Sequence, residues 1–427
     1  MPDKPIISTK TKRNLILFPG DTLLTCRLQI MKARKKLSKK STAFQICHSI
    51  TEVEKKEYDS IQPDNNPFFE FDFLFALEKS GCVGPGTGWE PRHLLLREEK
   101  KLVGTVTFYL KTDSYGEYIF DWQWARAYQD AGLRYYPKAV AGVPFTPATG
   151  PRIIVRADYN YKACARALAK KLIEICSLKS LSSIHFLFVT AEEQELLSDC
   201  GFLSRLTHQY HWRNSGYLCF DDFLGDLRSG RRKQIKKEKR RLRDLGVEVS
   251  VLEKEQIRRE HIDSIWEFYV NTNSRKWGSA YLNREFFDLV FETYREKTVL
   301  VIARIDGRPV GGTINFRKGD KLYGRYWGCN VEVPYLHFEC CYYRPIEFAI
   351  DNGMNVFEAG AQGEHKFLRG FEAVPVYSSH LFFNPGAQSS IDNFLRGERP
   401  YMRSLISEYN KHSPLKRARG GKSEKIV

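Results

Sequence analysis

Residues 299–371 read VLVIARIDGRPVGGTINFRKGDKLYGRYWGCNVEVPYLHFECCYYRPIEFAIDNGMNVFEAGAQGEHKFLRGF, and this stretch contains the pattern that decides the fold. Three β-rich runs, 299–305, 309–316 and 322–328, are separated by turn signals and predict an antiparallel meander. A helical stretch over 335–352 and a short apolar strand over 354–359 follow. The predicted order is therefore β-β-β-α-β.

Polar residues gather where the last of these strands ends. In mixed sheets with crossover helices, the ends of strands are where functional sites tend to lie. Acylation of an amine needs a proton acceptor and a donor that stabilises the carbonyl oxygen as it becomes negative. Glu358 or His365 could accept the proton, whereas Lys366, Arg369 or a backbone N–H could hold the oxyanion. The predicted catalytic residues are Glu358, Glu364, His365 and Lys366.

The helix over 335–352 carries unusual polar residues among aromatic ones. A carboxylate in such surroundings is costly unless it is paired, so we expect Glu339 to pair with Arg325, either to fix helix to sheet or to line a groove. Upstream, two cations beside the Trp277 indole suit an anionic or ring-bearing ligand. The predicted substrate-binding residues are Arg275, Lys276, Trp277, Arg325, Tyr326, Trp327, His337, Glu339, Tyr343 and Arg369.

The composition is that of a globular protein with two to three domains. The net charge of +16 over 427 residues is concentrated in three segments, 1–43, 226–246 and 411–427, and not on a broad face, so DNA is not an expected partner. Ten cysteines without a C-x-x-C pair predict neither a disulfide framework nor a metal site, and they indicate a reducing compartment. The sequence predicts no transmembrane segment and a cytoplasmic location, or an organelle stroma or matrix if 1–43 is a transit peptide.

The internal basic segment, 226–246, is predicted to be a helix. Ile235, Leu242 and Leu245 fall along one stripe, and cations cover the remaining surface. Either this is a solvated helix docked by its stripe, or it places cations over a polyanion such as tRNA, a diphosphate-linked sugar carrier or an anionic membrane surface. The predicted phosphate-binding residues are Arg232, Lys233, Lys236, Lys237 and Arg240.

The order of elements upstream repeats that of 299–371. Strands over 93–97, 102–110 and 118–124 form a second predicted meander, and a proline-punctuated segment over 135–152 is expected to be extended and to line a groove. The remaining predicted elements are a helix over 158–180, a strand over 184–189, a helix over 192–198 and a strand over 205–212. The fold class is therefore mixed α/β with two tandem units. The predicted domains are a basic leader (1–43), a first domain (44–225), a linking helix (226–246), a second domain with the transfer site (247–410) and a basic tail (411–427).

Two tandem GNAT-like units joined by a basic segment resemble the Fem family of aminoacyl-tRNA-dependent peptidyl transferases of bacterial cell-wall synthesis. The closer resemblance is to the FemAB-like N-acyltransferases, and it is carried, over about residues 44–415, by SGCVGPGTGW, GEYIFDWQWARAY, YYPKAVAGVPFTPATGPR, RKWGSAYL, YGRYWGC, HFECCYY and EAGAQGEHK. It implies an enzyme that moves an acyl or aminoacyl group onto an amine, with aminoacyl-tRNA as donor and a peptidoglycan-type precursor as acceptor.

Two departures from these families bear on the donor. The loop over 329–334 has no glycine and carries a glutamate, which disfavours a CoA pyrophosphate. Leu368 stands where Fem proteins have the lysine of F-K-x-G-F, and Lys366 or Arg369 would have to replace that lysine. We expect no tightly bound cofactor. The alternatives are an acyl-CoA-dependent transferase acting on a small amine or a protein, and a non-catalytic protein that binds a cell-wall precursor or tRNA.

Overall fold

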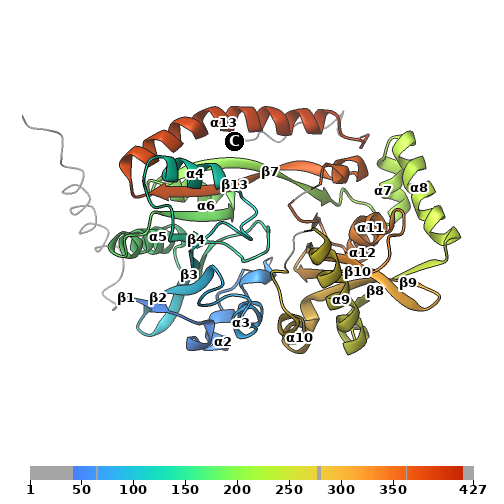
Figure 1. Cartoon of the computed structure of the whole chain (residues 1–427), viewed down its shortest axis with the longest axis horizontal. Coiled ribbons are helices and arrows are strands. Elements are labelled where there is room, and N and C mark those ends of the chain that lie inside the picture. Colours follow the sequence, from blue (N-terminus) through green and yellow to red (C-terminus); the bar gives the residue numbers. More distant parts are fainter. Residues whose placement is uncertain (1–41, 64–65, 277–279, 362, 417–427) are drawn as a thin grey trace, which may run out of the picture. The chain divides into compact units, whose positions relative to one another are not determined.

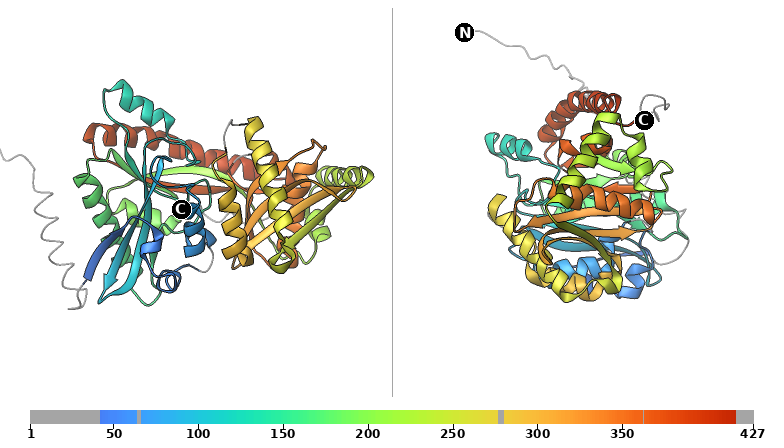
Figure 2. Two further views of the ribbon diagram at one scale, coloured as in Figure 1. Left: turned by 60° about the horizontal axis from the view of Figure 1, so that its bottom comes forward. Right: turned by 90° about the vertical axis from the view of Figure 1, so that its right-hand side faces the viewer.

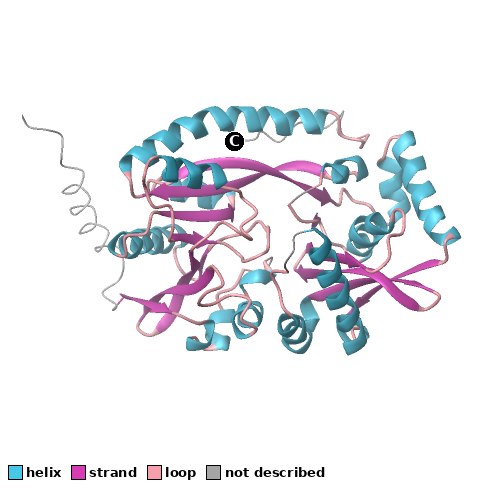
Figure 3. Ribbon diagram, in the orientation of Figure 1, coloured by secondary structure: helices cyan, strands magenta, loops and turns pink. Residues whose placement is uncertain are grey.

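The computed structural model describes residues 42–63, 66–276, 280–361 and 363–416. Apart from Thr42, these residues belong to one compact unit, Ala43–Val427. Most of the predicted leader and most of the predicted tail lie outside the described residues. Figure 1 labels the elements, and Figure 3 distinguishes helices from strands.

The predicted meander is confirmed. Strands β9 (Thr298–Ile305), β10 (Arg308–Lys318) and β11 (Lys321–Cys329) pair in antiparallel order, and β8 (Val247–Glu253) adds to the free side of β9. Asp306 and Gly307 both have positive φ in the tight turn between β9 and β10, a conformation that Asp-Gly adopts readily.

The predicted helix and last strand are also present. The helix is formed by α11 (Leu336–Phe338), a π-helical turn η5 (Glu339–Tyr343) and α12 (Arg344–Asp351). Strand β12 (Val356–Glu358) runs parallel to β11, and their pairing ends at the pair Tyr323–Glu358. Because β11 continues to Cys329, its residues from Gly324 onward extend past the end of β12. The candidate site lies at this point.

The first half of the chain confirms most, but not all, of the predicted elements. It contains β1 (Thr42–Cys47), α2 (Lys55–Asp59), α3 (Phe71–Lys79), β2 (Trp89–Glu98), β3 (Lys101–Lys111), β5 (Ile153–Val155), α5 (Tyr161–Leu178), β6 (Ser183–Val189), α6 (Ala191–Ser198) and β7 (Leu203–Arg213). The predicted strand over 118–124 is wrong, because α4 (Trp122–Asp130) begins there and buries Trp124 and Tyr128 one turn apart. The third strand of this meander is instead β4 (Lys138–Ala141), inside the proline-punctuated segment.

One mixed sheet runs through both halves of the sequence in the order β1-β2-β3-β4-β6-β13-β7-β12-β11-β10-β9-β8, with β5 beside β3. Strand β13 (Glu372–Phe382) comes late in the chain but lies between β6 and β7, antiparallel to both. At its far end, β7 pairs with β12 (Figures 1 and 2). The division predicted at residues 225 and 247 stays a prediction, and the sheet is continuous across it.

The remaining helices cover the sheet. They are α7 (Phe220–Asp226), α8 (Ser229–Asp244), α9 (Arg259–Lys276), α10 (Arg284–Thr293) and α13 (Pro385–Lys411). Helix α13 follows β13 directly and lies along β13 and β7 in Figure 1. Among the described helices, none combines the length and the apolar character needed to cross a bilayer.

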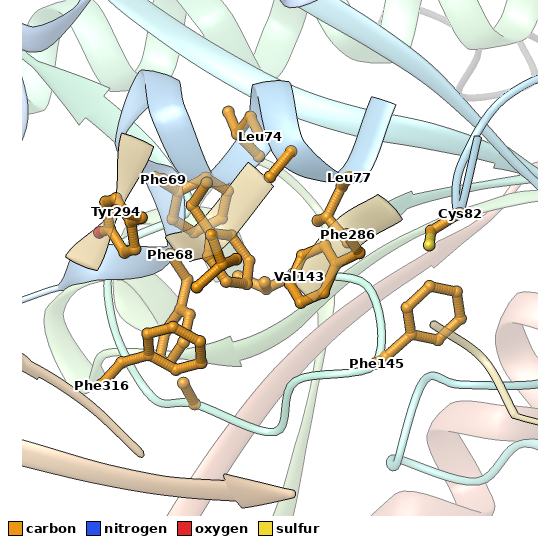
Figure 4. Close-up of a cluster of buried hydrophobic side chains, with 14 of the residues drawn as sticks. Phe68, Phe69, Leu74, Leu77, Cys82, Val143, Phe145, Phe286, Tyr294 and Phe316 are labelled. Carbon is orange, nitrogen blue, oxygen red and sulfur yellow. The ribbon is translucent and has the colours of Figure 1, made fainter. Parts of the chain in front are cut away.

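An aromatic cluster joins the two halves beneath the site (Figure 4). Phe68, in the turn η2 (Pro67–Phe69), lies edge-on to Phe316 of β10 at 5.6 Å between ring centroids and to Tyr323 of β11 at 5.1 Å. All three side chains are fully buried. Burying a side chain of this size contributes about 1.5–3 kcal/mol, so this packing holds the start of β11 firmly against the first half.

Candidate active site

Glu358 is the last residue of β12, and its side chain is only 2% exposed. Its Oε2 accepts a hydrogen bond from the backbone N–H of Thr149 at 3.2 Å, and His211 Nε2 lies 3.8 Å from the same oxygen. Thr149 belongs to the part of the proline-punctuated segment that follows β4. This segment, predicted from sequence to line a groove, therefore reaches the predicted catalytic carboxylate.

Lys366 lies on the short 3₁₀ helix η6 (Glu364–Arg369) and is also 2% exposed. Its Nζ donates a hydrogen bond to the carbonyl oxygen of Gly360 at 2.7 Å, and no carboxylate of the described residues forms an ion pair with it. Burial lowers the pKa of Lys366 to about 7, and the positive charge of Arg325 adds to the effect against an opposing contribution from Cys341. At neutral pH this side chain is therefore a partly neutral amine.

Arg325 and Tyr326 extend β11 past the end of β12 toward the same place. Arg325 Nη1 donates to the carbonyl oxygen of Gly324 at 2.7 Å, and a Cβ atom placed on Gly360 would lie 3.9 Å from that oxygen and 4.0 Å from Lys366 Nζ. Tyr326 donates from its hydroxyl to the carbonyl oxygen of Phe145 at 3.3 Å. Strand β11, the proline-punctuated segment and the turn after β12 thus converge on one site.

His365 lies beside Lys366 in the sequence, but in an aromatic cluster. Its Nε2 is 2.7 Å from the Tyr342 hydroxyl, and its ring lies 5.5 Å from that of His337, which in turn packs against Trp327 at 5.4 Å. Burial, and then the charges of Lys366 and Arg369, lower the pKa of His365, so its imidazole is neutral near pH 7.

Glu364, the remaining predicted catalytic residue, is exposed and accepts a hydrogen bond from the Tyr409 hydroxyl of α13 at 3.3 Å. Among the described residues, no hydrogen bond or ion pair links Glu364 or His365 to Glu358. The structure therefore buries Glu358 at the end of β12 and Lys366 against the turn that follows it, and leaves Glu364 exposed.

The predicted pair between Arg325 and Glu339 is wrong. Glu339 lies 3.0 Å from Arg344 Nε and 3.5 Å from Lys239 Nζ of α8. The physical reason is the π-helical turn, which places residues five apart on the same face and so brings Arg344 beside Glu339. The consequence is that Arg325 has no carboxylate partner from this helix.

Arg369 anchors helix α8. Its Nη2 lies 3.2 and 3.3 Å from the two carboxylate oxygens of Glu238, and its Nε donates to the Tyr343 hydroxyl at 2.9 Å. The Tyr343 hydroxyl donates in turn to Glu238, and the Arg369 guanidinium stacks over Phe338. Glu238 is not among the predicted residues, although its spacing between Ile235 and Leu242 places it on their buried stripe.

Helix α8 presents most of its cations to solvent. Ile235 and Leu242 are buried as predicted, whereas Leu245 is 36% exposed, because it is the C-cap residue beyond the last helical turn. Lys239 turns inward and lies 4.5 Å over the Phe220 ring. Of the predicted phosphate-binding residues, Arg232 is half-buried and the others are exposed, namely Lys233, Lys236, Lys237 and Arg240.

Arg275, a predicted substrate-binding cation on α9, lies near the far end of β11. Arg275 donates from Nη2 to the carbonyl oxygen of Cys329 at 2.7 Å and lies 3.5 Å from Glu332. Trp277 and the side chain of Lys276 lie outside the described residues. Arg275 is thus engaged with the loop after β11, and the structure does not bring it to Glu358.

A surface hollow of about 670 Å³ lies elsewhere, along α4, and residues such as Trp122, Arg126 and Tyr136 line it. None of the predicted site residues is among those that line this hollow. The described residues contain no group of three or more His, Cys, Asp or Glu side chains arranged to hold a metal ion.

Residues 49–417 match the model of the FemAB-like family, described as peptidoglycan biosynthesis/recognition. The chain belongs to the FemAB-like family. Membership of this family indicates a transferase role in general. Among curated proteins, none matches the sequence.

Solved structures show the same fold at low identity. FemX is 12% identical, with a TM-score of 0.51 over 82% of this chain and 100% of that one. The C-terminal domain of a putative lysylphosphatidylglycerol synthetase from Agrobacterium fabrum is 9% identical, with a TM-score of 0.51 over 81% and 97%. A tandem GNAT protein from the clavulanic acid biosynthesis pathway matches more weakly, at 11% identity and a TM-score of 0.42 over 81% and 99%. The fold of this FemAB-like protein is mixed α/β, as predicted.

Proposed function

We propose that this protein is an N-acyltransferase that moves an aminoacyl group from aminoacyl-tRNA onto an amine of a peptidoglycan-type precursor. The observation that carries the proposal is Lys366, a buried amine whose pKa is lowered to about 7 and whose Nζ donates to Gly360, two residues beyond the strand that carries Glu358. A side chain that exchanges a proton near neutral pH is the group that amine acylation requires.

The proposed step uses Lys366 as the proton carrier. The amine nitrogen of the acceptor attacks the carbonyl carbon of the aminoacyl ester, and a C–N bond forms. Neutral Lys366 accepts the proton that the nitrogen must lose. The C–O bond to the tRNA ribose then breaks, and the ammonium of Lys366 returns the proton to the departing oxygen. Glu358, held by Thr149, stabilises the positive charge that appears on these nitrogen atoms.

Helix α8 supports tRNA as the donor. Its exposed cations form an outer face suited to phosphates, because a polyanion bound there releases counterions. The same helix is tied through Glu238 to Arg369, three residues beyond Lys366 on η6. A polyanion bound to α8 would therefore be held next to the element that carries the proposed proton carrier.

The test compares donors directly. The purified full chain is incubated with amine acceptors of the peptidoglycan type and with either labelled aminoacyl-tRNA or labelled acyl-CoA, and label in the amide product is counted. We expect transfer from aminoacyl-tRNA. Transfer from acyl-CoA alone would show that acyl-CoA, and not aminoacyl-tRNA, is the donor. Binding of the acceptor without transfer from either donor would show that the protein is a non-catalytic binder.

Two substitutions test the site within the same assay. Glu358→Gln should lower turnover on the order of a hundredfold with little change in melting temperature, since charged and general-base groups typically contribute that much. His365→Ala tests whether the aromatic cluster takes part in the proposed step. It should lower turnover less than Glu358→Gln does. If both variants melt far lower yet keep full specific activity in the folded fraction, these residues are structural.

A further inference from the structure

One edge of the Arg325 guanidinium is buried and unused. Its Nε and Nη2 have no hydrogen-bond partner among the described residues, whereas its Nη1 is satisfied by the Gly324 carbonyl oxygen. These two nitrogens carry the parallel N–H bonds with which arginine grips a carboxylate or phosphate in a bidentate pair. In the part of the chain that the structure describes, no other arginine has two such nitrogens.

Arg152 differs from Arg325, because none of its side-chain nitrogens lacks a hydrogen-bond partner. Arg152 is completely buried, and all three of its nitrogens donate to carbonyl oxygens, Nε to Leu187 at 2.6 Å, Nη1 to Gly150 at 3.1 Å and Nη2 to Ala148 at 2.5 Å. Burying a charged donor without a partner costs free energy, and native proteins seldom leave one so. Because all nitrogens of Arg152 are hydrogen-bonded, the two unbonded nitrogens of Arg325 are a candidate ligand-binding site.

The residue that binds Glu358 also has an unused donor. The Thr149 Oγ1 is buried and has no hydrogen bond within the described residues, while the backbone N–H of the same residue binds Glu358. Glu358 is the charged group that acts most strongly on Arg325, but no ion pair joins the two side chains in the described structure. A hydroxyl donor and a two-pronged cation are thus both available beside the proposed transfer site.

The aromatic residues around the guanidinium favour a flat ligand. The Arg325 Cζ lies 4.8 Å from the Phe68 ring centroid and 5.3 Å from that of Tyr323. Lys366, partly neutral, adds little positive charge, and Glu358 would repel a dianion. One arginine therefore balances one negative charge, which suits a carboxylate better than a phosphate.

We infer that Arg325 binds a free carboxylate of the amine acceptor through Nε and Nη2, with the Thr149 hydroxyl as an additional donor. The acceptor would then be an amino acid or a peptide with a free carboxylate, bound so that its amine faces Lys366 across Gly360. The identity of the carboxylate-bearing molecule as an acyl acceptor rests on the proposed function, but its binding to Arg325 does not.

Binding is tested without turnover. Isothermal titration calorimetry on the full chain compares L-alanyl-L-alanine, its C-terminal amide and inorganic phosphate as probes. We expect the dipeptide acid to bind roughly tenfold or more tightly than the amide, since hydrogen bonds to charged groups are worth that much. Arg325→Gln should abolish this preference, and Arg325→Lys should restore only part of it, because lysine has no fork of donors.

Melting temperature supplies the control. Arg325→Gln should melt at the same temperature as the natural protein or higher, because it removes an unpaired buried charge, whereas Arg152→Gln should melt lower. Equal affinity for acid and amide would overturn the inference, as would tighter binding of phosphate than of the dipeptide acid or a persistent preference in Arg325→Gln. If the acid is preferred but no acyl transfer is found with any donor, the carboxylate site stands and the proposed function fails.

Discussion

Two lysines, Lys138 at the start of β4 and Lys366 after β12, are almost completely buried but lie in opposite electrostatic surroundings. Lys138 Nζ lies 2.9 Å from a carboxylate oxygen of Glu117 and is also bonded to Asp121. Burial acts to lower the pKa of Lys138, but these carboxylates outweigh it and raise the pKa overall. Within the described residues, Lys366 has only a carbonyl oxygen as its hydrogen-bond partner, and its pKa falls to about 7.

The difference separates a structural role from a chemical one. A lysine held between carboxylates has a raised pKa and keeps its proton near neutral pH, so it can fix a loop but does not exchange a proton there. A lysine buried without a counterion is costly to keep charged, and that cost is what brings its pKa to neutrality. The following substitutions test this contrast.

Replacing Lys138 by Met should have the largest effect, on stability. It leaves Glu117 and Asp121 buried without their cation, and breaking such a pair typically costs about 3–5 kcal/mol in the free energy of unfolding. Urea denaturation measures the change. Lys101→Met, which removes an exposed lysine 3.1 Å from Asp158, is the matched control and should cost less than about 1 kcal/mol. A cost for Lys138→Met no larger than that of the control would remove the distinction between the two lysines.

Replacing Lys366 by Met should reduce turnover on the order of a hundredfold, because the proton carrier is lost. The same change should raise the melting temperature by a few degrees, at roughly 1 °C per kcal/mol for a chain of this length, since a buried unpaired charge is removed. Calorimetry and the transfer assay measure the two effects. Lys411→Met, on the exposed end of α13, should change neither. Lower stability with full specific activity would assign Lys366 a purely structural role.

The pH dependence should follow the lowered pKa of Lys366. Turnover of the natural protein should rise about tenfold per pH unit below about pH 7 and then level off, as neutral amine forms. Between pH 7 and the unfolded lysine value near about 10.4, the unfolded chain holds a proton that the folded chain has released, so this group makes stability rise with pH. Titrating both quantities in Lys366→Met should show both slopes reduced. If Lys366→Met keeps measurable turnover and its pH profile is identical to that of the natural protein, Lys366 is not the titrating group.

The smallest effect is expected on α8. Charge reversal at Lys236, Lys237 and Arg240 should weaken tRNA binding roughly three- to fivefold near physiological salt and flatten its salt dependence. The fold should survive, because Ile235 and Leu242 stay buried. Filter binding across a salt series measures both, with reversal of three exposed lysines on and just after α5 as control, namely Lys162, Lys170 and Lys179. Affinity that is the same in both triple variants would show that α8 does not contact the phosphates.

Much of the fold could be predicted because its elements are periodic or bounded by turn residues. Asp306-Gly307 fixes a hairpin, and the apolar runs of β9 to β12 are long enough to identify from the sequence alone. The sequence over 118–124 predicts a strand, because aromatic residues favour strands. Helix α4 forms there instead, because it lets Trp124 and Tyr128 pack against Phe382, which is far away in the sequence.

The candidate site was harder to predict, because its geometry depends on long-range contacts. The loop after β12 was identified as polar, but adjacent residues there point in different directions: Glu364 faces solvent and Lys366 is buried. The periodicity of the sequence does not indicate the π-helical turn, which places Glu339 beside Arg344 and not beside Arg325. Thr149 became a neighbour of Glu358 only through contact across the two halves of the chain.

The position of β13 has a consequence for synthesis of the protein. When the first half of the chain leaves the ribosome, β6 lacks the neighbour that will separate it from β7, since residues 372–382 are not yet made. At typical elongation rates of about 5–20 residues per second, that edge stays open for roughly ten to forty seconds. An open strand edge is a template for pairing with another chain. Nascent chains should therefore depend on chaperones until β13 closes the gap, and fragments that end before residue 372 should aggregate when expressed alone.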